Sequence, residues 1–178
     1  GIAIGGQLTT ADGSSKPNGV ITAAANGGTA NGTAQATSFD TFFSAADLIT
    51  LKYTLAAPYR AGGVGKYMVS STAMAKMRKF RDSTGGFLFQ PSLVAGVPGT
   101  FDGDAVIENP GMAAVASATK GVAYGDFSRY FVRKTPTRVD MSQDYKFSTD
   151  QLALRTVERV DGDLIDTIAV AYLVSANV

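Results

Sequence analysis

YMVSSTAMAKMRKFRDSTGGFL, residues 67–88, is the stretch that decides the fold. Its first residues, Tyr67–Ser70, form a short apolar run typical of a buried strand. Ser71 or Thr72 can then cap a helix over residues 71–82, whose basic later half complements the negative end of the helix dipole. The apolar residues that recur at helical spacing, and that we expect to be buried, are Ala73, Met74, Met77 and Phe80.

A second helix is predicted before this stretch, over residues 40–57. Ser38 or Asp40 can cap its start, and Pro58 is expected to stop it. The apolar stripe predicted to face the core consists of Phe42, Ala46, Ile49, Tyr53 and Ala56.

Short strands dominate the rest of the chain. We expect strands at 105–107, after a turn at Asp102-Gly103, and at 122–124 and 130–132. Asp161-Gly162 predicts a two-residue hairpin between strands 152–160 and 165–174. Near the N-terminus, Val20-Ile21-Thr22 is the one strand candidate, and Asn26-Gly27-Gly28 is typical of a loop. Helices and strands intersperse without a βαβ rhythm, which favours the α+β class.

Composition excludes many enzymes. The chain has 178 residues, no His, no Cys and no Trp, and a net charge of +1. A Ser-His-Asp triad, a Cys nucleophile, a thiolate or imidazole zinc site and a disulfide framework are therefore excluded. The balanced charge gives no support for a nucleic-acid groove, and no apolar run approaches the ~20 residues that span a bilayer.

The remaining chemistry would have to come from carboxylates, and the carboxylates do not form a recognisable motif. Asp102 and Asp104 flank a glycine in a predicted turn. Asp161, Asp163 and Asp166 form the densest cluster, but Ile165 occupies the fifth position of the calcium-loop pattern and no distal Glu follows. The two glutamates, Glu108 and Glu158, lie in no motif. We expect turn and surface roles for all of them.

Three further patterns have structural interpretations. The glycine-rich segment 61–67 misses the first glycine and the final Ser/Thr of a phosphate-binding loop, so we interpret it as a helix-to-strand connection. The basic run 76–81 fits a solvated helix end. The aromatic residues Tyr124, Phe127, Tyr130 and Phe131 fit a packed β core better than a base-stacking platform. We therefore predict no catalytic, cofactor-binding or metal-binding residue and no cofactor.

Five segments, in this order, resemble motifs of the major capsid proteins of tailed bacteriophages, the family with the Hong Kong 97-type fold. Ala105 stands where that family usually has Pro in the "P-x-T-L-x-G-x-P-V" signature. The segments are Lys16–Ile21, Tyr67–Leu88, Pro98–Val106, Gly125–Tyr130 (the "G-D-F-x-x-Y" motif) and Arg159–Asp163 (the late "R-x-D-G" hairpin).

This resemblance implies a structural subunit of an icosahedral phage or prophage capsid, not an enzyme. Such subunits assemble with themselves into pentamers and hexamers in the virion, having been made in the host cytoplasm. They enclose double-stranded DNA without specific binding, and they use no membrane and no small-molecule substrate. The alternatives are a carboxylate-dependent hydrolase using Asp102, Asp104 or the Asp161–Asp166 cluster, and an encapsulin-type nanocompartment shell protein of the same fold.

The resemblance also implies a domain division. Residues 30–137 plus 163–178 would form the axial A-domain, and residues 1–29 plus 138–162 would be a remnant of the peripheral P-domain. The chain starts at Gly1 without an initiator Met. We therefore expect a fragment in which the N-terminal arm, the E-loop and the spine helix of the family are absent.

Overall fold

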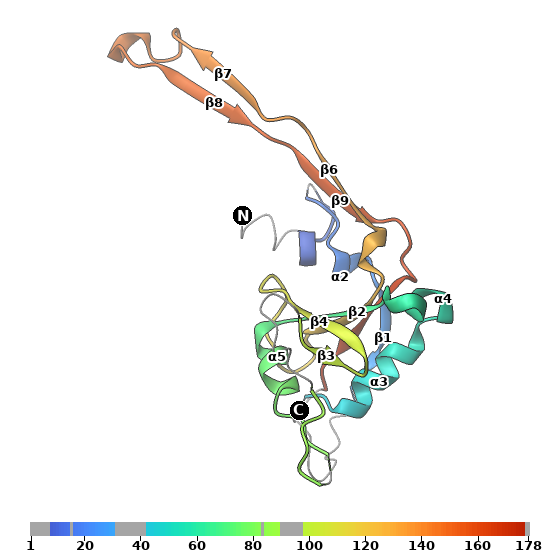
Figure 1. Ribbon diagram of the computed structural model, residues 1–178. Coiled ribbons are helices and arrows are strands. Elements are labelled where there is room, and N and C mark those ends of the chain that lie inside the picture. Colours follow the sequence, from blue (N-terminus) through green and yellow to red (C-terminus); the bar gives the residue numbers. More distant parts are fainter. Residues whose placement is uncertain (1–7, 15, 31–41, 83, 90–97, 177–178) are drawn as a thin grey trace.

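The computed structural model describes residues 8–14, 16–30, 42–82, 84–89 and 98–176. Two parts are distinct in Figure 1: a head built on a six-stranded sheet, and a long antiparallel ribbon, residues 130–164, that projects from it. The mixed α+β class is confirmed. Within the described residues no helix is long and apolar enough to cross a bilayer.

The head sheet has the strand order β1-β10-β5-β2-β4-β3. Two of its pairings, β1 with β10 and β2 with β4, are parallel, and the other three are antiparallel. The strands are β1 (Ala25–Thr29), β2 (Lys66–Val69), β3 (Thr100–Phe101), β4 (Asp104–Glu108), β5 (Val122–Gly125) and β10 (Val170–Val174).

Alternation along the central strands builds a core on each face of the sheet. In β2, Tyr67 and Val69 pack with the helix α3 (Ala45–Thr54) and the helix α5 (Ser71–Met77), whereas Met68 packs on the opposite side. On that side lies the short helix α2 (Val20–Ala23). Successive side chains of a strand point to opposite faces, so a sheet covered on both faces needs apolar residues at nearly every position. One face of the head sheet is thus packed against α3 and α5, the helices found in the two regions where the sequence predicted helices.

Helix α5 begins at the predicted residue 71 but ends at Met77, five residues before the predicted end at residue 82. Ala73, Met74 and Met77 are buried, as is Phe80 just beyond the helix. The cap is Ser70, whose hydroxyl accepts a hydrogen bond from the Ala73 amide at 3.3 Å, and not the predicted Ser71 or Thr72.

Helix α3 corrects the second prediction. Its buried face holds Leu48 and Leu51, while Ile49 and Tyr53 of the predicted stripe are 41% and 61% exposed. The helix begins after Ser44, which forms a capping box with Asp47, so neither Ser38 nor Asp40 is the cap. It ends at Thr54, and Pro58 lies in the first turn of the next helix, α4 (Ala57–Arg60). Proline suits that position because its missing amide would be unbonded there anyway.

Most of the predicted strands are present, whereas one strand prediction, one loop prediction and one turn prediction are wrong. Strands appear at the predicted 105–107, 122–124 and 130–132, within β4, β5 and β6 (Tyr130–Lys134). However, Val20–Thr22 is helical, the predicted loop at 26–28 lies in β1, and Asp161-Gly162 lies inside β9 (Val160–Leu164) instead of turning a hairpin. β9 continues straight because it pairs with β6 along its whole length.

Candidate functional site

The ribbon is the most unusual feature of the molecule. Near the head, β6 pairs with β9, and further out β7 (Arg138–Ser142) pairs with β8 (Ala153–Val157). The short 3-10 helix η3 (Phe147–Thr149) lies in the turn at the tip. In Figure 1 the outer half of this ribbon extends far beyond any other described element.

The two faces of the outer ribbon differ in chemistry. Residues paired directly across two antiparallel strands share a face. Val139 pairs with Thr156 and Met141 with Leu154, so these four define what we call the apolar face. The other face carries the pairs Asp140 with Arg155 and Ser142 with Ala153.

The apolar face is open to solvent. Val139, Met141 and Leu154 are 63%, 62% and 67% exposed, and Phe147 at the tip is 83% exposed. An isolated two-stranded ribbon is at best marginally stable in water. A contiguous apolar face on such a ribbon therefore indicates a surface that is covered by another element or another molecule.

The base of the ribbon is firmly attached to the head. The Tyr130 hydroxyl donates to the Asn18 carbonyl at 2.8 Å. The Asn18 amide donates to the Gly162 carbonyl at 2.9 Å, and its side-chain amide donates to Asp163 Oδ1 at 2.9 Å. Leu164 and Tyr130 pack with α2. The ribbon thus leaves the head in a fixed direction.

Asp102 and Asp104, the first candidate catalytic pair, lie together but serve an ion-pair cluster. The Lys52 ammonium is 2.9 Å from Asp102 Oδ2 and 2.8 Å from Asp104 Oδ2, and the Tyr124 hydroxyl donates to Asp104 at 2.9 Å. Burial alone would lower the pKa of Lys52, but the hydrogen bonds to Asp104 and Asp102 outweigh it and raise that pKa. Burial and the bond to Asp104 raise the pKa of Tyr124. The cluster therefore holds a protonated lysine between two carboxylates and offers no free base.

The carboxylates at 161–166 are not brought together as a ligand set. Asp163 accepts from Asn18, and Asp166 accepts from the Tyr59 hydroxyl at 2.7 Å. Asp161 accepts a hydrogen bond from the amide of Gly162. Among the described residues no group of three or more acidic side chains could hold a metal ion.

The two glutamates and the other patterns lie apart from one another. Glu158 pairs with Lys134 in the ribbon, and Glu108 ends β4 in the head. The glycine-rich segment connects α4 to β2 through the 3-10 helix η1 (Ala61–Gly63), as predicted. Of the four aromatic residues expected in a core, Tyr124 is fully buried but Phe131 is 57% exposed on the ribbon.

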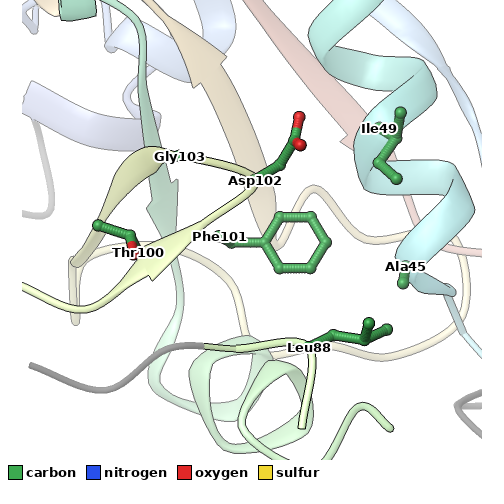
Figure 2. A pocket seen from close by; sticks show the side chains of 7 residues that line it. All are labelled: Ala45, Ile49, Leu88, Thr100, Phe101, Asp102 and Gly103. Carbon is green, nitrogen blue, oxygen red and sulfur yellow. The ribbon is translucent and has the colours of Figure 1, made fainter. Parts of the chain in front are cut away.

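A shallow pocket of about 310 Å³ lies between α3 and the β3–β4 hairpin. Figure 2 shows Phe101 and Asp102 of the hairpin facing Ile49 of α3, with Leu88 below them. Among the described residues that line the pocket, the one charged side chain is Asp102, which is already paired with Lys52. This arrangement suits an apolar contact and not catalysis.

The sequence prediction missed the apolar face because it placed the hairpin turn at Asp161-Gly162. The signal was present in the alternation of Arg138, Val139, Asp140, Met141 and Ser142, which is the period-two pattern of a strand with one polar face.

Comparisons with known proteins agree with a shell subunit. The sequence matches the phage capsid family over residues 2–175. The chain is similar, at 26% identity, to the capsid subunits of empty and native gene transfer agent particles, with TM-scores of 0.73 and 0.76. Each match covers 98% of this chain and 61% of that one, so the chain spans about three fifths of those subunits.

A more distant likeness supports the fold alone. A chain of Gordonia phage Cozz is 14% identical, with a TM-score of 0.55, over 94% of this chain and 55% of that one. No curated protein matches the sequence.

Proposed function

This chain belongs to the phage capsid family, a structural family without enzymatic activity, and from that premise we propose that it is a subunit of an icosahedral shell. The shell would belong to a phage, a prophage or a gene transfer agent, and its subunits would assemble into pentamers and hexamers. The subunit would be made in the host cytoplasm and end in the particle.

The observation that carries this proposal is the apolar face of the ribbon. A long, firmly based ribbon with three exposed large apolar side chains on one face is unsuited to a free monomer. In a closed shell each subunit contacts several others, so such a surface can be covered along its length. A carboxylate-dependent hydrolase would instead require free carboxylates, and both members of the candidate pair are held in ion pairs with Lys52.

The division into domains follows from the same proposal. We propose that residues 30–137 plus 163–178 form the axial A-domain, and that residues 1–29 plus 138–162 belong to the peripheral P-domain. The outer ribbon, from β7 to β8, then falls in the P-domain. The family's N-terminal arm, E-loop and spine helix would correspond to the part of the longer capsid subunits that this chain does not match.

We further propose that the shell encloses double-stranded DNA without gripping specific sequences. The net charge of +1 and the ribbon, on which Arg and Lys are mixed with Asp and Glu, support a wall that faces DNA without a basic groove.

The experiment is to pellet particles from cells that carry the gene and to identify their proteins by mass spectrometry. The polypeptide that carries these residues should be the most abundant protein of the particle fraction. If the cells release particles but this polypeptide is found only in the supernatant, the proposal is contradicted.

A further inference from the structure

Arg60, the last residue of α4, has a buried group without a partner. Its Nε is buried and makes no hydrogen bond within the described part of the chain. Its guanidinium carbon lies 4.5 Å from the centroid of the Tyr53 ring, so the side chain is held by stacking. A buried donor that lacks an acceptor is costly, and such groups in native proteins call for an explanation.

The backbone beside Arg60 is open to close approach. Gly62 and Gly63 have φ values of +71° and +72°, and no atom lies within 4 Å of where a Cβ would be placed on either. Lys66, at the end of the same connection, is exposed. A second chain can therefore approach the terminal nitrogens of the guanidinium across this loop, although the buried Nε stays out of its reach, and the approaching group should be anionic.

Glu108 is an acidic residue of the head that, like Arg60, has a charged side chain without an ionic partner among the described residues. In the described part of the head, Asp12, Asp47, Asp82, Asp102, Asp104, Asp126 and Asp166 all accept hydrogen bonds or pair with a cation. The exposed carboxylate of Glu108 makes no hydrogen bond and no ion pair with the described residues.

The two side chains lie at opposite ends of one strand. The connection from Arg60 enters β2 at Lys66, and β2 ends at Val69, whose register partner on β4 is Glu108. A strand of this length extends about 10 Å, and Figure 1 shows α4 beyond one end of it and α5 beyond the other. Arg60 and Glu108 of one copy therefore lie toward opposite ends of β2.

We propose that Arg60 of one copy pairs with Glu108 of the next copy around the capsomer. This inference rests on the proposed function and names the contact that joins neighbouring heads. A ring of identical subunits needs a head-to-tail interface, in which one surface of each copy meets a different surface of its neighbour. A cation at one end of β2 and an unpaired carboxylate at the other end satisfy that requirement, and the pair gives the terminal nitrogens of the Arg60 guanidinium a carboxylate partner.

The first experiment is a charge swap in the polypeptide as the producing cells make it, read by sedimentation of rings and shells. R60E and E108R should each lower the assembled fraction at least about tenfold, because each brings two like charges together at the interface. The double variant R60E/E108R should recover assembly to within about twofold of wild type. K79E is the matched control, because it makes the same charge change at an exposed lysine elsewhere on the head.

A second experiment guards against a misfolded R60E. Carbodiimide treatment joins a carboxylate to an amine with loss of water, and R60K supplies an amine at this position. Assembled R60K should yield a peptide pair linked through positions 60 and 108 of different copies, and R60K/E108Q should not. A link from Glu108 to Lys66 in its place would overturn the assignment to Arg60.

The outcomes separate the two proposals. If wild-type protein forms no ring or shell, the proposed function fails and this inference fails with it. If wild type assembles and the single variants assemble equally well, or the swap restores nothing, only the pairing of Arg60 with Glu108 is overturned.

Discussion

Lys52 of α3 and Asp104 of β4 join the helix to the strand next to the edge of the head sheet, with 2.8 Å between ammonium and carboxylate. The Lys52 and Asp104 side chains are only 14% and 11% exposed, whereas that of Asp102, the second partner, is 43% exposed. Tyr124 donates to the same carboxylate oxygen of Asp104. The cluster is therefore a structural link in which the two aspartates contribute unequally.

Because the two aspartates contribute unequally, D104N and D102N should lower the free energy of unfolding by different amounts. D104N should lower the free energy of unfolding by about 2 kcal/mol, because it leaves the largely buried Lys52 without its nearer partner. D102N should lower the free energy of unfolding by less than about 1 kcal/mol, because exposed ion pairs usually contribute no more than that. Chemical denaturation of both variants checks this, and equal losses would refute the unequal roles.

The acid dependence of stability should include a contribution from Asp126. Burial alone would raise its pKa, but hydrogen bonds from the Ser128 hydroxyl and amide, together with Arg129, outweigh burial and hold the pKa below its ordinary value of 3.8. A carboxyl with a lowered pKa in the folded state stabilises the fold above its unfolded pKa, and the stabilisation is lost as the pH falls through the folded value.

The stability difference between wild type and D126N should therefore be largest near neutral pH and shrink below about pH 4. Urea denaturation at a series of pH values measures this difference. A difference that stays constant down to about pH 2 would show that Asp126 does not act through its charge.

Gly125 should tolerate no side chain. Its φ is +154°, and a Cβ there would overlap the carbonyl oxygen of Ala169 in the neighbouring strand connection. G125A should lower the free energy of unfolding by at least about 2 kcal/mol. G103A is the control, since Gly103 also has a positive φ, +82°, but open space around it. G103A should lower the free energy of unfolding by about 1 kcal/mol. Similar thermal melting temperatures for the two variants would contradict the steric account.

The apolar face of the ribbon should be needed for assembly but not for the stability of the head. M141K and L154K should each lower the assembled fraction at least about tenfold, because a charge would be buried at a contact between subunits. S142K is the control on the opposite face of the same strand. Sedimentation of particles measures the effect. Full assembly of M141K would show that the apolar face of the ribbon is not part of a contact between subunits.

The β2–α5 stretch could be predicted because local pattern and tertiary packing agree there. The stripe of Ala73, Met74, Met77 and Phe80 is the only apolar one that segment offers, and the head buries all four. On α3 two stripes compete, since Leu48 and Leu51 are as apolar as Ile49 and Tyr53. The sheet packs against the leucines, a choice that periodicity alone does not determine.

Glycines account for much of what could not be predicted. The segment at Gly27 has the composition of a loop, yet it pairs with β10 as strand β1, and Leu51 occupies the space that a Cβ on Gly27 would fill. Gly19 lies so close to the backbone of Thr10 and Ala11 that only glycine fits, and α2 begins directly after it. Such close approaches depend on distant parts of the chain, so local turn chemistry gives the wrong structure there.

The site was only partly predictable for a related reason. The lack of His and Cys in the sequence excludes most catalytic chemistry by itself, and the pairing with Lys52 removes Asp102 and Asp104 from the remaining candidates. The ribbon required knowledge of pairing between strands far apart in sequence, because Met141 and Leu154 share a face only in that register.

The most direct test of the central claim is a reconstruction of the particles by electron cryomicroscopy. We predict an icosahedral shell in which the head and ribbon fit the density of each subunit, with Val139, Met141 and Leu154 covered by neighbouring protein. Particles whose shell density does not accommodate this fold, or in which the apolar face lies open to solvent, would contradict the account.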